Sequence, residues 1–297
     1  MSEVFKTIDL EKIIRGSNSK FLKSLSKFII RLIVKLIHQD EMNQTINRNR
    51  HLTGLPFVTE ILKDWKVNVI IKGEENIPKT GKFVFVANHP VGGIDALSFL
   101  SAIYRFYPVV ISPANQLFQY IPNLHPVILS VNVFGANTKD TASKLNQLFE
   151  SDSQIMIFPA GEVSRRNKGV ISDIVWQKSF ITKSVRFKRD IIPVFINGRN
   201  SNFFYFIANL RKLLGIKMYL ETILLPGEMM KQRNSSITLT IGKPMPWQTF
   251  TTEKSQNDWA QFVKKVVYDM DNRLIYQDSS KRAGLEVIEK IFDYLKF

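Results

Sequence analysis

A short apolar segment, residues 83–87, leads through a glycine-containing turn into a helical segment, and this unit constrains the fold more than any other part of the chain. Phe83-Val84-Phe85-Val86-Ala87 has the β-branched and aromatic composition of a buried strand. The turn Asn88-His89-Pro90-Val91-Gly92-Gly93-Ile94-Asp95 follows, and residues 96–106 have a helical pattern. Gly92 and Gly93 permit unusual backbone angles and close approach of a ligand. The turn is therefore expected to expose side chains and backbone N–H groups.

This turn carries a histidine and an aspartate. His89 lies within the turn, and Asp95 lies at the start of the helix. A histidine held by a carboxylate is the arrangement of a general base that deprotonates a hydroxyl. The alternative is that Asp95 only caps the helix and that His89 is an ordinary loop residue. The residues alone leave both interpretations open.

Two further apolar strands end in polar turns. Residues 155–158 lead into Pro159-Ala160-Gly161-Glu162-Val163-Ser164-Arg165-Arg166, and residues 191–196 lead into Asn197-Gly198-Arg199-Asn200-Ser201. Arginine binds phosphate or carboxylate through paired hydrogen bonds, and the N–H groups of a tight turn add donors for an anion. Each turn alone also fits a surface loop with solvated charges, but three polar strand ends favour one common site.

Alternating strands and helices predict an α/β fold, with a ligand site where loops leave the strand ends. The expected strands are residues 67–71, 83–87, 109–112, 129–134, 155–158, 191–196 and 236–241. The expected helices are residues 38–66, 96–106, 138–150, 201–214, 220–231, 254–276 and 280–296. We divide the chain into an N-terminal helical, membrane-associating region (residues 1–66), an α/β domain (67–250) and C-terminal helices packed on that domain (251–297).

Residues 20–37 have the pattern of an amphipathic helix. Basic residues recur every three or four positions and form one stripe: Lys20, Lys23, Lys27, Arg31 and Lys35. Apolar residues form a broad opposite face: Leu22, Leu25, Ile29, Leu32, Ile33 and Leu36. Such a helix suits the interface of an anionic membrane, and its charges argue against a transmembrane span. The alternative is a helix packed on its own domain, with solvated lysines.

The composition excludes several kinds of site. The 297 residues include no cysteine, which excludes disulfides, thiolate catalysis and cysteine-ligated zinc. The four histidines lack metal-ligand spacing, so we expect no metal. The net charge of +15 suits a nucleic acid, a membrane surface or an acidic ligand. Because we find no nucleic-acid-binding motif, secretory signal or long apolar run, we expect an anionic membrane surface as the partner and no nucleic acid.

The polar strand ends resemble the sequence blocks of the glycerolipid (1-acylglycerol-3-phosphate type) acyltransferases. Asn88-His89-Pro90 with Asp95, then residues 158–165, then Ile192-Pro193-Val194-Phe195-Ile196 occur in the order of that family. The wording of residues 88–95, with Gly198-Arg199-Asn200-Ser201, is closer to a branch described as haemolysin-like. That branch includes the O-acyltransferases that complete ornithine and glycine aminolipids.

The resemblance implies a central mixed sheet flanked by helices and an O-acyltransferase site. His89 would act as the general base and Asp95 would orient it. Amides of the glycine turns, at Gly92, Gly93 or Gly161, would stabilise the oxyanion. The residues that would hold the acceptor head group are Glu162, Ser164, Arg165, Arg166 and Arg199.

The resemblance also implies the reactants and the location. The donor would be acyl-ACP or acyl-CoA, so the partners include an acyl carrier protein or a CoA thioester, and no cofactor is expected. The acceptor would be a lysolipid, such as lyso-ornithine lipid, lyso-glycine lipid or lysophosphatidic acid. The protein would be peripheral on the cytoplasmic face of the inner (plasma) membrane. The alternative is a non-catalytic lipid-binding protein of the membrane surface.

The sequence departs from the wider family at three places. Five residues separate His89 from Asp95, where that family has four, and one extra helical residue would turn the carboxylate away unless Gly92-Gly93 absorb it. Ala160 stands where that family has a glutamate, and residues 131–135 lack the arginine of its second block. An acceptor with a carboxylate head group therefore fits the anion site at least as well as a glycerol phosphate.

Overall fold

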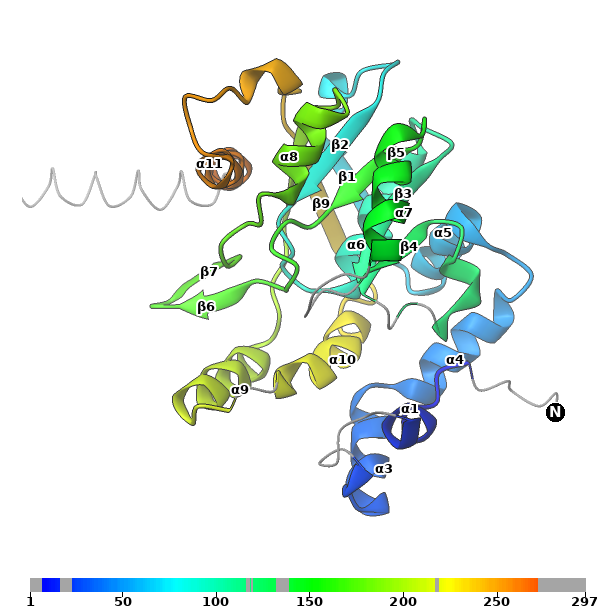
Figure 1. Cartoon of the computed structure of the whole chain (residues 1–297). Helices are drawn as coiled ribbons and strands as arrows, with labels where there is room; N and C mark the ends of the chain where they lie inside the picture. Colours follow the sequence, from blue (N-terminus) through cyan, green and yellow to red (C-terminus); the bar gives the residue numbers. More distant parts are fainter. Residues whose placement is uncertain are drawn as a thin grey trace, which may run out of the picture.

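A mixed seven-stranded sheet forms the centre of the molecule (Figure 1). The computed structural model describes residues 7–16, 23–115, 118, 120–131, 139–216 and 219–271. The strand order is β1-β9-β8-β2-β5-β3-β4, and β6 and β7 form a separate antiparallel hairpin. The strands are β1 (Asn68–Lys72), β2 (Phe83–Ala87), β3 (Val110–Asn115), β4 (Ile128–Val131), β5 (Gln154–Ile157), β6 (Arg165–Asn167), β7 (Val170–Ser172), β8 (Asp190–Ile196) and β9 (Ser236–Ile241). Neighbouring strands are parallel except β8 and β9, so the predicted mixed sheet is confirmed.

Helices cover both faces of this sheet, and further helices lie beyond one end of it. The helices of the described residues are α1 (Leu10–Gly16), α3 (Lys27–Leu36), α4 (Gln39–Arg48), α5 (Gly54–Asp64), α6 (Gly93–Tyr104), α7 (Lys139–Glu150), α8 (Ser179–Arg186), α9 (Asn202–Leu213), α10 (Leu225–Met230) and α11 (Gln256–Asp269). Helices α1, α3 and α9 are among those that lie beyond the end of the sheet. Short 3₁₀ helices cover Glu74–Asn76, Pro122–Leu124, Leu220–Leu224 and Trp247–Thr249. Helices α4, α5, α6 and α10 contribute to the hydrophobic cluster on one face, and α7, α8 and α11 to the cluster on the other.

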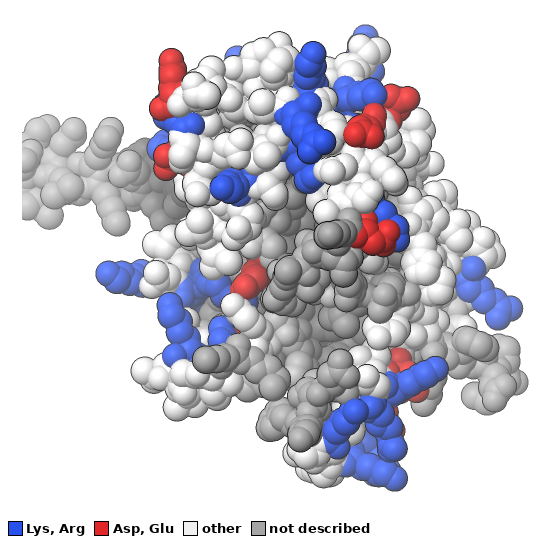
Figure 2. All heavy atoms as spheres, viewed as in Figure 1, with Lys and Arg blue, Asp and Glu red and all other residues white. Residues whose placement is uncertain are grey.

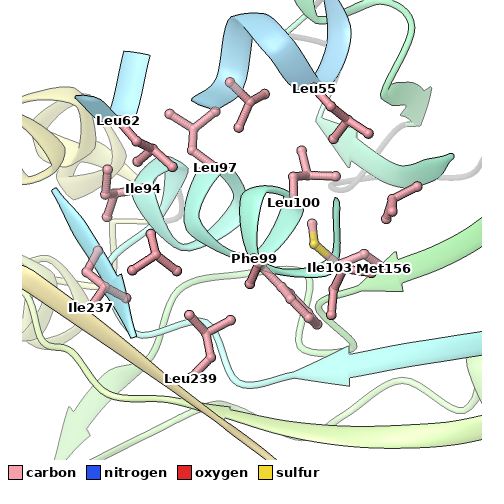
Figure 3. Close-up of a cluster of buried hydrophobic side chains, with 14 of the residues drawn as sticks. Leu55, Leu62, Ile94, Leu97, Phe99, Leu100, Ile103, Met156, Ile237 and Leu239 are labelled. Atoms are coloured by element: carbon pink, nitrogen blue, oxygen red, sulfur yellow. The ribbon is translucent and has the colours of Figure 1, made fainter. Parts of the chain in front are cut away.

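The central strands explain why both faces are covered. In β2, Phe85 and Ala87 point to one cluster, whereas Val84 and Val86 point to the other. All five residues of β2 are buried, as expected for a parallel strand between two helical layers. Helix α6 is buried nearly all round, and Figure 3 shows it between α5 and the strands. Because α6 is held from both sides, the turn before it has a fixed position.

Several element boundaries differ from the prediction. The helix predicted over residues 38–66 is two helices, α4 and α5, separated at residues 49–53. The hairpin β6–β7 and helix α8 were not predicted. The helix predicted over residues 96–106 is shifted, because α6 already begins at Gly93. The predicted helix over residues 280–296 lies outside the described residues.

The N-terminal helix α3 packs through one side only. Residues 27–36 of the predicted 20–37 are helical, and residues 20–22 lie outside the described part of the chain. Ile30 is buried, whereas Phe28 is 68% exposed and Leu32 is 52% exposed. Among the described residues, no helix is both long enough and apolar enough to span a membrane.

Candidate active site

The three polar turns meet at one end of the sheet, where their strands finish. Strands β8, β2 and β5 are adjacent and parallel, with Val194 beside Ala87 and Val86 beside Ile157. Their carboxyl ends therefore point the same way, and the segments that follow them lie side by side. Ligands of α/β sheets bind outside these carboxyl ends. This topology brings the three segments into one region.

His89 and Asp95 are in direct contact. The Nδ1 atom of His89 lies 3.0 Å from Oδ2 of Asp95. A carboxylate can only accept a hydrogen bond, so Nδ1 carries the proton and Nε2 keeps its lone pair. The Asp95 side chain is fully buried, whereas the His89 side chain is 17% exposed. The imidazole stacks on the ring of Phe158, with centroids 4.0 Å apart. The arrangement is that of a general base with its orienting carboxylate.

Asp95 contacts both the start of the helix and the histidine. Its Oδ2 also accepts hydrogen bonds from the backbone N–H groups of Val91 (2.8 Å) and Gly92 (2.9 Å). Asp95 is the third residue of α6, so it caps the helix and holds His89 with the same oxygen. The helix start and the imidazole are therefore fixed together.

Gly92 accommodates the extra residue between His89 and Asp95. Its φ of 127° and ψ of −129° belong to a region that is essentially restricted to glycine. Because α6 begins only at Gly93, residues 90–92 form a turn and do not rotate Asp95 away. The six-position step from histidine to aspartate therefore still gives a hydrogen bond.

Two anchors hold the backbone of residues 88–95, which we call the catalytic turn. The side chain of Asn88 accepts from the backbone N–H of Ile196 (2.7 Å) and donates to the carbonyl of the same residue (2.9 Å). This pair fastens the end of β2 to the end of β8. The carbonyl of His89 accepts from the N–H of Ser164, at 2.7 Å. The first and second polar turns are thereby joined directly behind the imidazole.

Asp173 is a buried carboxylate that the sequence analysis did not identify. Its Oδ1 accepts from the backbone N–H of His89 (3.2 Å) and from the hydroxyl of Ser164 (2.6 Å). Its Oδ2 accepts from Nε1 of Trp176 at 2.9 Å. Burial raises the pKa of Asp173. The backbone of Asp173 is in turn held by Tyr268 and Lys264 of α11. No sequence motif marks Asp173, because its partner His89 is 84 positions away.

Ser164 is placed differently from the prediction. Its side chain is buried, at 1% exposure, and its hydroxyl is used by Asp173. The side chain therefore supports the catalytic turn and does not face a head group. Likewise, the N–H of Gly161 donates to the carbonyl of Phe158, and that of Gly92 donates to Asp95. The N–H of Gly93 is at the first position of α6, where a helix supplies no acceptor, so Gly93 is the candidate oxyanion donor.

Arg165 is part of a neutralised cluster. Its Nη2 contacts Glu162 at 3.0 Å and Glu221 at 3.2 Å. The fully buried Glu221 also pairs with Nε of Arg211, at 2.8 Å. The Glu162 carboxylate raises the pKa of the neighbouring Tyr219. Two arginines and two glutamates cancel in charge, so this cluster attracts an anion less strongly than an unpaired arginine would.

Arg166 and Arg199 lie outside this cluster and share an asparagine as partner. Both Nη2 atoms donate to Oδ1 of Asn202, at 2.8 Å and 2.5 Å respectively. The guanidinium of Arg166 also lies over the ring of Tyr205, 4.8 Å from its centroid. Within the described part of the chain, neither arginine forms an ion pair with a carboxylate. Two converging guanidinium groups form a suitable anion site.

The described residues contain no cluster of three or more histidine, aspartate or glutamate side chains that could hold a metal ion. The segments after β2, β5 and β8 bring the His89–Asp95 pair, Arg166 and Arg199 to the same end of the sheet. A hydroxyl near Nε2 would lose its proton to the imidazole, and the resulting nucleophile would attack a carbonyl.

The chain is similar to known acyltransferases. The family model described as "Acyltransferase" matches residues 13–276. The chain is 40% identical to the lyso-glycine lipid O-acyltransferase of Bacteroides thetaiotaomicron, over 89% of this chain and 97% of that protein. It is 39% identical to the lyso-glycine lipid O-acyltransferase of Phocaeicola vulgatus, over 89% of this chain and 95% of that protein. Among solved structures, the 1-acyl-sn-glycerophosphate acyltransferase PlsC from Thermotoga maritima matches with a TM-score of 0.43 and 17% identity, over 82% of this chain and 92% of that chain.

The two lyso-glycine lipid O-acyltransferases settle the family. Each is more than 30% identical to this chain and is covered almost completely by it. The family model spans the catalytic turn and all seven strands of the sheet. The resemblance noted in the sequence is confirmed: the chain belongs to the acyltransferase family and is an acyltransferase.

Proposed function

We propose that this acyltransferase moves a fatty acyl chain from a thioester to the hydroxyl of a lysolipid, with His89 as the general base. The observation that carries the proposal is the 3.0 Å contact between Nδ1 of His89 and the buried Asp95. It leaves Nε2 as the basic atom at the edge of the sheet where ligands bind. Membership of the acyltransferase family supports catalysis over a purely lipid-binding function.

The proposed reaction is balanced by one proton cycle. The acceptor hydroxyl attacks the thioester carbonyl and transfers its proton to Nε2 of His89. The Gly93 N–H faces the developing oxyanion. The tetrahedral intermediate then expels the thiolate, which takes the proton from the imidazolium, and an ester replaces the thioester. Asp95 stabilises the imidazolium and fixes the tautomer, so no nucleophilic side chain is required.

The acceptor class that we propose is a lyso-aminolipid with a carboxylate head group, such as lyso-glycine lipid. Two relatives of about 40% identity carry that name. The neutralised Arg165 cluster and the Arg166–Arg199 pair suit a singly charged carboxylate, which an arginine pair binds well. The proposed donor is acyl-ACP or acyl-CoA.

Peripheral membrane association is the second part of the proposal. The exposed apolar side chains of α3 lie beside Lys27, Arg31 and Lys35, which are also exposed. A basic stripe next to an apolar face favours an anionic bilayer surface. We place the enzyme on the cytoplasmic face of the inner membrane, where both a lysolipid and a soluble thioester are available.

The test is a product assay with defined reactants. Purified protein is mixed with acyl-ACP or acyl-CoA and with liposomes that carry lyso-glycine lipid, lyso-ornithine lipid or lysophosphatidic acid. Mass spectrometry then identifies any diacyl product, and a thiol reagent reports thioester consumption. We expect the diacyl aminolipid from one of the two lyso-aminolipids. Acylation of lysophosphatidic acid alone would contradict the acceptor class, and the absence of every product would contradict the reaction.

A further inference from the structure

Helix α9 exposes an unusually large apolar stripe. Its exposed apolar residues recur at steps of three and four, so they share one side of the helix: Phe203 (54% exposed), Phe206 (60%), Leu210 (36%) and Leu213 (81%). Leu214, directly after the helix and four positions after Leu210, is 62% exposed. The opposite side, with Phe204 and Tyr205, is buried against the protein. The exposed side therefore has no role in the internal packing of the described residues. A continuous exposed apolar stripe of this kind on a protein marks an interaction site.

The stripe on α9 lies next to the exposed side of α3. A groove of about 350 Å³ is lined by Leu32 and Leu36 from α3 and by Phe203 from α9. Helix α10 joins the two, because Gly227 packs so closely that a Cβ there would lie 2.5 Å from the carbonyl oxygen of Leu36. Figure 1 shows α3, α9 and α10 together at one end of the molecule. We call the exposed apolar side chains of α3, of α9 and of the residue directly after α9 the docking face: Phe28, Ile29, Leu32, Leu36, Phe203, Phe206, Leu210, Leu213 and Leu214.

The charge around the docking face identifies its partner. The sequences of α3 and α9 contain no aspartate or glutamate. Exposed Lys27, Arg31 and Lys35 lie on α3, and exposed Lys212 lies on α9. Figure 2 shows basic side chains gathered at this end of the molecule. Glu228 also lines the groove, but it is buried and paired with Lys231. The exposed charged residues of the two helices are basic, which matches the anionic head groups of a bilayer, and the apolar side chains match its acyl chains.

Helix α9 is also tied to the catalytic turn. It begins directly after Ser201, and the side chain of the preceding Asn200 donates to the carbonyl of Pro90 at 3.3 Å. The anion site of Arg166 and Arg199 is built on Asn202, the first residue of α9. Seating α9 in the interface would therefore set the catalytic turn at the level of the lipid head groups.

We infer that α9 is a second membrane-contacting element, which docks together with α3 on an anionic bilayer and orients the active site toward it. This inference rests on the proposed membrane association, and it adds a helix that follows the third polar turn, far in sequence from the N-terminal region. The occupant of the docking face is a lipid bilayer. A second copy of the chain, or another segment of this chain, would be a different outcome of the test.

The natural absence of cysteine allows a direct test with site-specific labels. Single variants Leu32→Cys on α3, Leu213→Cys on α9 and Val109→Cys are labelled with a polarity-sensitive fluorophore. Val109 is the matched control, because it is 51% exposed and apolar but precedes β3, at the opposite edge of the sheet. Each protein is titrated with phosphatidylethanolamine vesicles that contain phosphatidylglycerol, and with phosphatidylcholine vesicles.

We expect a blue shift for the Leu213→Cys and Leu32→Cys labels with phosphatidylglycerol vesicles, and none for Val109→Cys. In unlabelled protein, Leu213→Asp is expected to lower vesicle partitioning about tenfold or more, because one large apolar side chain no longer enters the interface, whereas Val109→Asp leaves it unchanged.

A shift at position 32 without one at 213 would overturn the inference and keep the proposed membrane association. A shift at 213 that depends on protein concentration and not on vesicles would overturn it in favour of self-association. No shift at either position would contradict membrane association as a whole. The product assay, repeated with the lysolipid in detergent micelles and without liposomes, would still report catalysis.

Discussion

At the scale of single residues, the catalytic pair depends on one backbone conformation. Gly92 adopts a φ of 127°, and its N–H donates to the same oxygen of Asp95 that holds His89. The residues alone could not decide between a helix cap and a catalytic carboxylate, because the step from His89 to Asp95 differs from that of the wider family. The structure shows that one side chain both caps the helix and contacts the imidazole.

We predict that Gly92→Ala lowers both stability and turnover. An alanine at this φ is strained by about 1–3 kcal/mol, and relief of that strain would move Asp95 away from His89. The measurements are the melting temperature and kcat in detergent micelles. Gly215→Ala is the control, since Gly215 also has a positive φ, of 66°, but lies at the end of α9 with open space around it. Equal loss of kcat in both variants would contradict a specific role for Gly92.

Asp173 gives a prediction about pH. Burial raises its pKa, so the folded protein binds this proton more tightly than the unfolded chain does. The unfolding free energy therefore falls as the pH rises from the unfolded pKa of about 4 through the raised pKa of the folded state, because the folded protein must then hold a buried charge. In Asp173→Asn this contribution disappears, and the difference in unfolding free energy between the variant and the wild type should shift in favour of the variant over that pH range. Denaturant unfolding between pH 4 and 8 measures it, and two parallel curves would argue against an ionisable Asp173.

At the scale of the elements, the sequence was most informative where the signals are local. Strands β2, β5 and β8 are apolar runs that end in polar turns, so the edge that carries the site was predictable. The hairpin β6–β7 was not, because β6 consists of Arg165, Arg166 and Asn167 and has no apolar residue. Helix α8 has only eight residues, which gives a short periodic pattern. The contacts of Asp173 and Glu221 with the site are purely tertiary and leave no pattern in the chain.

The Arg166–Arg199 pair and the Arg165 cluster should behave differently. Replacing Arg166 and Arg199 together by glutamine removes two charge-assisted contacts, and we expect the KM for the lysolipid to rise about 10- to 100-fold with little change in melting temperature. Arg165→Gln removes the positive charge that contacts both Glu162 and Glu221. It should therefore lower the melting temperature instead.

The control for the double variant removes the same charge elsewhere, at the exposed Arg50 and Arg186. Steady-state kinetics and thermal unfolding of the three proteins separate the two effects. A rise in KM that the control shares would point to membrane electrostatics and not to an anion site.

At the scale of the whole molecule, the sheet carries its chemistry at one edge and presents apolar helices beside it. In the proposed membrane association, the net charge of +15 would act together with those helices. Composition alone allowed a nucleic acid, a membrane or an acidic ligand as the partner. The exposed apolar sides of α3 and α9 are what favours the bilayer.

We predict that binding to phosphatidylglycerol vesicles weakens about tenfold or more between 0.05 M and 1 M salt. Screening shortens the reach of the basic groups, whereas the apolar contribution of α3 and α9 is retained, so some binding remains at high salt. Vesicle flotation at the two salt concentrations measures this. An affinity that does not respond to salt would rule out an electrostatic share in docking.

The central claim is that His89 removes the proton from the acceptor hydroxyl, and the most direct measurement is kcat for His89→Ala in the assay that gives the diacyl product. We expect a loss of about two to four orders of magnitude with a melting temperature near that of the wild type. His51→Ala, which removes an exposed histidine far from the site in sequence, should retain full activity. A folded His89→Ala protein that acylates lysolipid at the wild-type rate would contradict the mechanism.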